Sequence, residues 1–179
     1  MADNEYDGHW ISTFTNKKLH YLKPNPDEIC IEDIAHALSL TCRFGGHCSE
    51  FYSVAEHSIR VMGIVTVKYK LEALLHDAHE AYLHDVPRPI KQDIPQYKIL
   101  ADNLQEAILT KFDCKTRNSK EVKKADDTML ATEARDLGFD TTDWMGLPPP
   151  LLAKIYPYIT SIKEIEERFK YKFRQALIL

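Results

Sequence analysis

Apolar residues recur at helical spacing over most of the chain. Ile31, Ile34, Ala35 and Leu38 stand at positions i, i+3, i+4 and i+7, which predicts an amphipathic helix from about residue 29. Capping-box patterns beginning at Ser53, Asn118 and Ser161 predict the starts of three more helices. We therefore expect an all-α helical bundle, with helices at about 29–38, 53–69, 70–83, 95–112, 118–137 and from 161 onward.

Three segments depart from this helical pattern. Residues 10–22 alternate apolar and polar side chains on either side of Asn16-Lys17, which predicts a small N-terminal β-hairpin. Pro87-Arg88-Pro89 predicts an extended loop, because proline fixes the backbone and restricts the preceding residue. Pro148-Pro149-Pro150 predicts a stiff break before the last helix.

Composition narrows the class of protein. A chain of 179 residues with 44% apolar and 28% charged residues is typical of one globular domain, here 1–179. No apolar run approaches the roughly 20 residues that span a bilayer, so we expect no membrane partner. A net charge of −4 without a long basic run does not favour nucleic-acid binding.

Two further features indicate the cytoplasm. The acidic start, residues 1–7, has no apolar core and does not resemble a secretory signal. The few cysteines show no CxxC spacing and are expected to be reduced thiols. They are Cys30, Cys42, Cys48 and Cys114.

Histidines and aspartates carry the most informative spacing. His57, the doublet His76-Asp77 and the distant Asp126 can supply two imidazoles and two carboxylates to one divalent ion. Adjacent helical residues point about 100° apart, so both members of the doublet reach one ion only at a junction between helices. This mixed donor set suits Mn, Co, Fe or Ni in six-fold coordination, or an expanded Zn site. A metal beside spare carboxylates is typical equipment for hydrolysing phosphate esters.

A zinc-protease motif is excluded by spacing. His79-Glu80 begins like HExxH, but the next histidine, His84, stands at i+5 and not at i+4. On a helix it would point to the opposite side.

With their flanking residues, these positions resemble the HD-domain phosphohydrolases, an all-α superfamily of metal-dependent phosphatases. The resemblance spans about 30–137 and is closest to the 5′-deoxynucleotidases and the compact phage dATP triphosphohydrolases. It is specific for the superfamily and less so for the substrate. The segments that carry it are Tyr52-Ser-Val-Ala-Glu-His57, Leu74-Leu-His-Asp77-Ala-His-Glu80, Asp85-Val-Pro-Arg-Pro-Ile-Lys91 and Lys124-Ala-Asp126.

The resemblance implies roles for particular residues. It makes His57, His76, Asp77 and Asp126 the metal ligands, with Asp127 as a rival to Asp126. Glu80 and Asp85 take the positions of acid/base carboxylates. Glu80 is also i+4 from His76, on the same side of a helix. The implied substrate contacts are Arg43, Phe44, His47, Pro89, Lys91 and Lys123: Arg43 on phosphate or sugar, Phe44 and Pro89 near the base, and His47 and the lysines near phosphates.

Several of these residues also have a purely structural interpretation. Asp85 could cap the loop before Pro87, Phe44 could belong to the core, and Pro89 could simply stiffen its loop. Lys91 and Lys123 could be solvated surface lysines.

The expected activity is hydrolysis of a deoxynucleoside 5′-triphosphate, with dATP favoured, to deoxynucleoside and triphosphate. The divalent ion could be Co, Mn, Zn, Ni, Fe or Mg. Alternatives are a 5′-deoxynucleotidase acting on monophosphates, an enzyme for a cyclic dinucleotide or alarmone, and a sensing module without turnover. The small size and the resemblance also favour a homo-oligomer, a dimer or higher. Phage and bacterial origins stay equally open.

Overall fold

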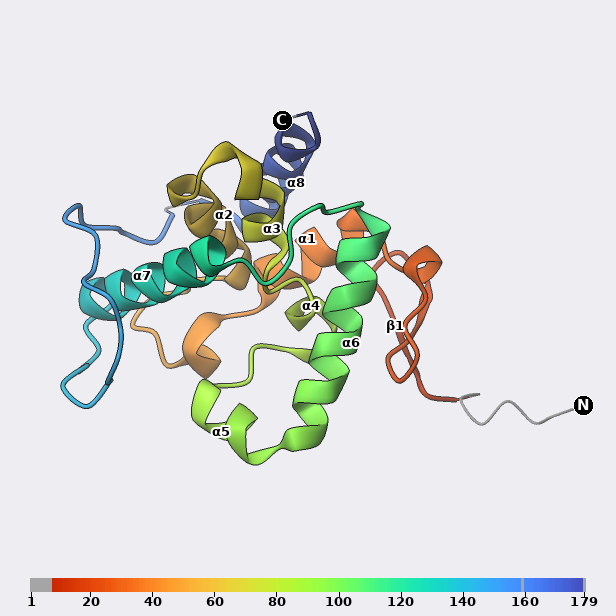
Figure 1. Cartoon of the computed structure of the whole chain (residues 1–179), viewed down its shortest axis with the longest axis horizontal. Coiled ribbons are helices and arrows are strands. Elements are labelled where there is room, and N and C mark those ends of the chain that lie inside the picture. Colours follow the sequence, from red (N-terminus) through yellow and green to blue (C-terminus); the bar gives the residue numbers. More distant parts are fainter. Residues whose placement is uncertain (1–7, 159, 179) are drawn as a thin grey trace, which may run out of the picture.

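A small hairpin precedes a set of helices (Figure 1). The computed structural model describes residues 8–158 and 160–178, so the acidic start, residues 1–7, lies outside the described residues. The strands are β1 (Trp10–Ser12) and β2 (Lys18–His20). The helices are α1 (Ile31–Leu40), α2 (Val54–Ile64), α3 (Lys70–Leu75), α4 (Glu80–Leu83), α5 (Arg88–Asp93), α6 (Pro95–Lys111), α7 (Lys120–Asp136) and α8 (Ile162–Leu177), with single 3-10 turns at Pro26–Glu28, Arg43–Gly46 and Val67–Tyr69.

The predicted hairpin is confirmed. β1 and β2 pair antiparallel, with Ile11 opposite Leu19, and Leu19 is fully buried. Asn16 adopts a φ of 61°, in the left-handed region that asparagine tolerates better than most residues. The turn therefore falls where the polar pair of the sequence predicts it.

The core lies among α1, α2, α3 and α8, which pack against one another. Ile34 and Leu38 of α1 are fully buried, as is Phe169 of α8. The mostly helical architecture with a small sheet is thus the one that the hydrophobic pattern predicts. In the part of the chain that the structure describes, no helix is both long and apolar enough to cross a bilayer.

Two predicted helices are shorter than their patterns suggest. The helix expected at 53–69 ends at Ile64, and the helix expected at 70–83 is interrupted after Leu75. Between α3 and α4 the backbone hydrogen bonds join residues three positions apart, as in a 3-10 helix. The amide of Ala78 donates to the carbonyl of Leu75, and the amide of Glu80 donates to the carbonyl of Asp77, both at 3.0 Å. The His76-Asp77 doublet therefore lies in a turn, and not inside a helix.

Two boundaries were predicted wrongly. Pro87-Arg88-Pro89 does not form an extended loop, because α5 begins at Arg88 and proline is tolerated in the first turn of a helix. The cap of α7 is Ser119, whose Oγ accepts a hydrogen bond from the amide of Val122 at 3.3 Å. Asn118 instead turns the chain with a φ of 50°.

The position of α7 matters most for the site. The helix runs across one side of the molecule, with α5 below it and α6 on the other side of the view (Figure 1). The carboxylate of Glu72 on α3 accepts a hydrogen bond from the amide of Ser119 at 2.7 Å, which fixes the start of α7 beside α3. Because α7 also packs on α2, its inner face lies against both elements that bear the histidines.

Candidate metal centre

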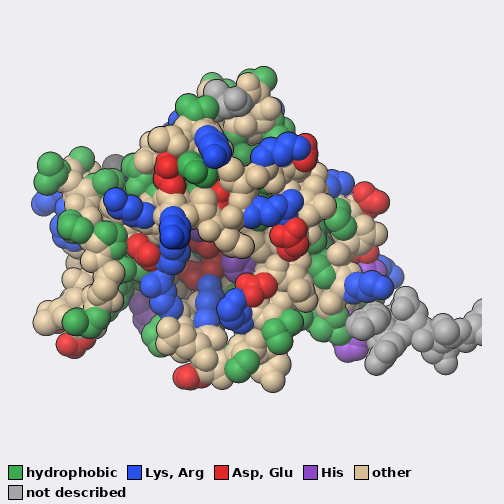
Figure 2. Space-filling model, viewed as in Figure 1, with side chains coloured by type: hydrophobic (Ala, Val, Ile, Leu, Met, Phe, Trp, Pro, Cys, Tyr) green, Lys and Arg blue, Asp and Glu red, His purple; other side chains and the backbone are tan. Residues whose placement is uncertain are grey.

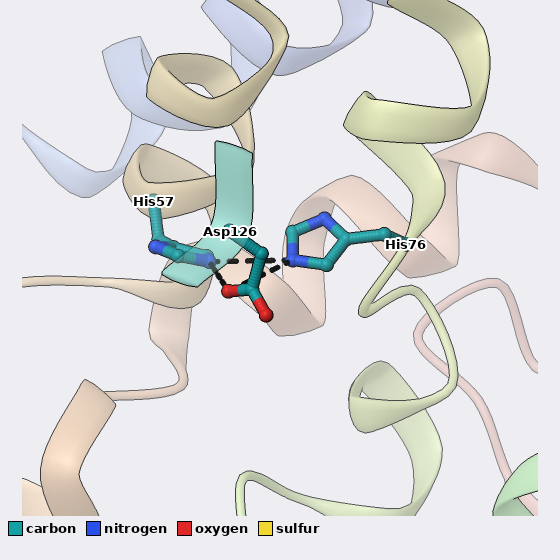
Figure 3. Close-up of side chains that lie close together, drawn as sticks. All are labelled: His57, His76 and Asp126. Atoms are coloured by element: carbon teal, nitrogen blue, oxygen red, sulfur yellow. Dashed lines mark hydrogen bonds and ion pairs between the residues drawn. The ribbon is translucent and has the colours of Figure 1, made fainter. Parts of the chain in front are cut away.

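Three separate elements bring the predicted ligands together. His57 projects from α2, His76 from the turn after α3 and Asp126 from α7, and their side chains point at a common centre (Figure 3). One ligand atom from each lies within 4.8 Å of the others. Asp126, and not its neighbour Asp127, therefore belongs to this cluster.

Asp77 lies at the edge of the same cluster. Its Oδ2 is 3.1 Å from Nε2 of His76 and 3.7 Å from Nε2 of His57. Oδ1 of Asp126 is 3.2 Å from the His57 nitrogen and 3.7 Å from the His76 nitrogen. Both carboxylates thus approach both imidazoles.

Hydrogen bonds fix which nitrogen of each imidazole faces the centre. Nδ1 of His57 donates to Oε1 of Glu133 at 2.6 Å, and Nδ1 of His76 donates to the carbonyl of Ala73 at 2.8 Å. Both partners can only accept, so each neutral imidazole keeps its lone pair on Nε2. The two Nε2 atoms are 3.3 Å apart.

The centre is therefore surrounded by electron-pair donors, namely the two Nε2 atoms and the carboxylate oxygens of Asp77 and Asp126. Such a cluster attracts positive charge. Burial lowers the pKa of His76, but the negative charges of Asp77 and Asp126 outweigh it and hold this pKa well above its usual range. Burial raises the pKa of Asp126, but its close contacts with both histidines bring it well below the usual range. Two oriented imidazoles with carboxylate oxygens form a donor set that fits a divalent ion.

Glu133 organises the far side of this centre. It is fully buried on α7, and besides His57 it accepts hydrogen bonds from the hydroxyl of Tyr52 at 2.8 Å and from Nε of Arg43 at 3.1 Å. Burial raises its pKa, but the charges of Arg43 and His57 outweigh burial, so the pKa lies below the usual value. A charged Glu133 therefore holds the ring of His57 in the orientation that metal binding needs.

A second carboxylate group lies beside the cluster. Glu80, at the start of α4, is 2% exposed and accepts a hydrogen bond from Nζ of Lys91 at 2.6 Å through Oε1. Its Oε2 is buried and has no hydrogen-bond partner among the described residues. Burial and the charges of Asp77 and Asp85 raise the pKa of Glu80 well above its usual value, against the opposing charge of Lys91. Asp85 lies 4.0 Å from the same lysine.

A cavity of about 570 Å3 opens onto this arrangement. In Figure 2 the face shows a hollow with acidic and histidine side chains at its bottom and lysine and arginine side chains at its edge. The cavity is large enough for a small organic ligand. Its lining includes the predicted site residues Arg43, Phe44, His47, Asp77, Glu80, Asp85, Pro89, Lys91 and Asp126, together with Arg88, Phe139, Trp144 and Met145.

Two predicted contacts take positions that the sequence does not reveal. Arg43 lines the cavity but is 7% exposed, and it pairs with Glu133 at 3.0 Å and with Asp77 at 3.9 Å. Lys123 stands outside the lining on an exposed turn of α7, where it contacts Asp127 and, at 3.4 Å, Asp126. Asp127 also pairs with Arg88 at 3.3 Å. It therefore holds the side chains of Arg88 and Lys123 together near the opening of the cavity.

Sequence reasoning missed several residues of the site. Glu133 follows Asp126 by seven positions and so returns to the same face of a helix after two turns, a signal that was present in the sequence. Phe139 and Trp144 follow the end of α7 and bear no motif. Only the fold brings them to the cavity.

Comparison with known proteins identifies relatives by sequence. The chain is 42% identical over 152 residues to the uncharacterized protein YfdR of Escherichia coli, an alignment that covers 83% of this chain and 85% of the relative. It is 34% identical over 163 residues to an uncharacterized protein of Rhodobacter capsulatus, covering 81% of this chain and 83% of that protein. No family model matches the chain.

Proposed function

The chain belongs to the same family as the Escherichia coli protein YfdR, and we propose that it is a divalent-metal-dependent phosphohydrolase of the HD-domain type. Its proposed substrates are deoxynucleoside 5′-triphosphates, with dATP favoured, and the products are deoxynucleoside and triphosphate. The observation that carries this proposal is the meeting of two oriented imidazoles with the carboxylates of Asp126 and Asp77, which line the same cavity as the buried Glu80.

The donor atoms suit a resident ion. His57 and His76 through Nε2, with Asp126 and Asp77, would hold the divalent ion. Such an ion supplies Lewis acidity toward a phosphate oxygen and lowers the pKa of water. The hydrogen bonds from the histidines to Glu133 and Ala73 keep both rings turned toward it.

Glu80 supplies the proton transfer. Lys91 holds Oε1, so the free oxygen is Oε2, which can accept the proton of an attacking water. Attack on the α-phosphorus in line with the 5′-oxygen breaks the bond between them. The departing 5′-oxygen, on the opposite side of the phosphorus, takes its proton from solvent water, and Glu80 then releases its own proton to solvent. Burial and the charges of Asp77 and Asp85 raise the pKa of Glu80, which favours its holding a proton.

The cations at the mouth favour a substrate with more than one phosphate. Arg88 and Lys123 are more than half exposed and share the carboxylate of Asp127. A polyphosphate chain that leaves the bottom of the cavity would meet their charges in turn. A monophosphate would use the same scissile bond but would gain little from them.

Product analysis tests this proposal. Metal-loaded protein is incubated with a panel of dNTPs, dNMPs and rNTPs, and deoxynucleoside, phosphate and triphosphate are quantified. We expect deoxynucleoside and triphosphate, formed fastest from dATP, with loss of turnover in His76→Ala. Glu80→Gln should lower kcat by about 10²–10⁴-fold, the range for general acid–base groups.

A histidine from the same segment serves as the matched control. The ring of His79 lies 3.2 Å from the side-chain oxygen of Gln105 on α6 and is not part of the metal cluster, so His79→Gln should keep turnover. If only monophosphates are hydrolysed, the proposal is wrong and the protein is a 5′-deoxynucleotidase. If nothing is hydrolysed with any divalent ion, the proposal is also wrong and the protein is a sensing module.

A further inference from the structure

Three aromatic rings form one wall of the cavity. The ring centroids of Phe44 and Phe139 are 4.6 Å apart, and Trp144 lies 6.5 Å from Phe44 and 6.3 Å from Phe139. The planes differ by only 30° to 36°. The rings thus present similarly oriented faces, and all three line the cavity.

The wall is built on the end of the helix that bears Asp126 and Glu133. Gly138 ends α7 with a φ of 81°, and the amide of Phe139 donates back to the carbonyl of Ala134 at 2.9 Å. The loop is then held by hydrogen bonds from the amide of Thr142 to Asp140 at 3.0 Å and from the amide of Trp144 to Thr141 at 2.9 Å. These local hydrogen bonds shape the segment that connects α7 to Trp144.

Phe44 joins this wall to the polar end of the cavity. Its φ of 56° lies in a region that bulky residues rarely adopt, and such conformations cluster at functional sites. The guanidinium of Arg43 lies 5.3 Å from the ring of Phe44 and 3.9 Å from Asp77. One side of the cavity thus changes from aromatic rings to charged groups over two adjacent residues.

We propose that Trp144, which lies beside Phe44, stacks on the base of the bound nucleotide, and that this contact favours purines. The inference rests on the proposed function for the class of ligand. A nucleotide has the same division into a charged end and a planar aromatic end. Trp144 is 37% exposed, and the neighbouring Met145 is 90% exposed, so apolar surface remains available beside the cavity. A purine covers more of this surface than a pyrimidine does.

Tryptophan fluorescence tests the contact without any turnover. The chain has two tryptophans, Trp10 and Trp144, so the variant Trp10→Phe leaves Trp144 as the single indole. The variant is titrated in chelator with dATP, dCTP and inorganic triphosphate. We expect quenching by both nucleotides, with dATP binding more tightly, and none by inorganic triphosphate. Equal quenching by inorganic triphosphate, or no response to dATP, would overturn the proposal.

Kinetics provide the second measurement. In Trp144→Ala we expect the KM for dATP to rise on the order of ten-fold, as for loss of a base–aromatic stack, with kcat and melting temperature nearly unchanged. Trp144→Phe should restore most of the affinity. Tyr156→Ala is the matched control, because this exposed aromatic does not line the cavity.

The two proposals fail separately. Quenching by dATP in a protein that hydrolyses nothing would refute the phosphohydrolase and support the base contact. Hydrolysis of dATP with an unchanged KM in Trp144→Ala would refute the base contact alone.

Discussion

Glu133 shows how one side chain can govern a site without entering it. Its carboxylate accepts hydrogen bonds from His57, Tyr52 and Arg43 and is fully buried. The position of the His57 ring and the neutralisation of the buried charge of Arg43 therefore depend on the same carboxylate.

We expect Glu133→Gln to weaken metal binding by about 10–100-fold, the usual effect of losing a partner behind a ligand. It should also destabilise the protein by about 3 kcal/mol, because the buried Arg43 loses its closest counter-charge. Metal titration and urea unfolding measure the two effects. Tyr52→Phe is the control, since it removes one hydrogen bond and leaves the His57 contact intact. Equal metal affinity in wild type and Glu133→Gln would contradict this role.

The residues of the cluster could be predicted from the sequence, whereas of their supports the sequence signals only the helix face of Glu133. The resemblance to the HD-domain family rests on the sequence segments that contain His57, His76, Asp77 and Asp126. In the structure these four side chains lie close together. Arg43 was expected on the substrate, but burial and its pairing with Glu133 make it a structural counter-charge as well. Such pairings join residues far apart in sequence, and no local pattern records them.

Among the elements, the break between α3 and α4 decides the direction of the doublet. α3 ends at Leu75, and in the turn that follows Oδ2 of Asp77 lies 3.1 Å from Nε2 of His76. The apolar pattern over 70–83 continues through the break, because Ala73, Leu74, Leu75 and Ala78 are all buried, so hydrophobic spacing alone could not reveal it.

Caps were the better-predicted feature of the helices. The patterns at Ser53 and Ser161 mark true helix starts, and α8 has the full reciprocal capping box. The pattern at Asn118 was one residue early, because Ser119 was an equally good acceptor. Local polar chemistry thus locates helix starts to within a residue, whereas helix ends depend on tertiary contacts.

The capping box of α8 gives a pH prediction. Hydrogen bonds from Thr160 and Ser161 lower the pKa of Glu164 to about 2, against about 4.3 in an unfolded chain. A lowered pKa contributes stability that is present above the unfolded value and is lost as the pH falls through the folded value. We expect Glu164→Gln to lower the melting temperature at pH 7 and to match wild type as the pH approaches 2. Thermal melts of both proteins from pH 7 to pH 2 measure this effect. A difference in melting temperature between wild type and Glu164→Gln that does not change with pH would argue against the contribution.

For the whole molecule, the hydrophobic pattern was sufficient to predict a helical protein with a small hairpin. It could not predict the cavity, which the turn at Arg43–Gly46, the segment from Asp77 to α5, α7 and the loop after α7 form together. The predicted single domain and homo-oligomer stay predictions, and light scattering would measure the oligomer.

Ion binding should stabilise the whole fold. At an ion concentration of about a hundred times Kd, linkage gives about 2.7 kcal/mol. For a chain of this length this is roughly 5–11 °C in melting temperature. Thermal melts in chelator and in Mn, Co, Zn, Ni, Fe and Mg would measure it. Asp126→Asn should lose most of the shift and His79→Gln should keep it. A shift that survives in Asp126→Asn would place the ion elsewhere.

The three elements that bear the cluster lie 19 residues (His57 to His76) and 50 residues (His76 to Asp126) apart along the chain, and an ion bound there would affect how long the folded protein survives. An ion held by α2, the turn after α3 and α7 would close two long loops, as a cross-link does, but one that forms only after these elements have docked. Opening the fold would then require release of the ion. The supply of metal in the cell would therefore set the lifetime of the folded chain against proteases, independently of any reaction it catalyses.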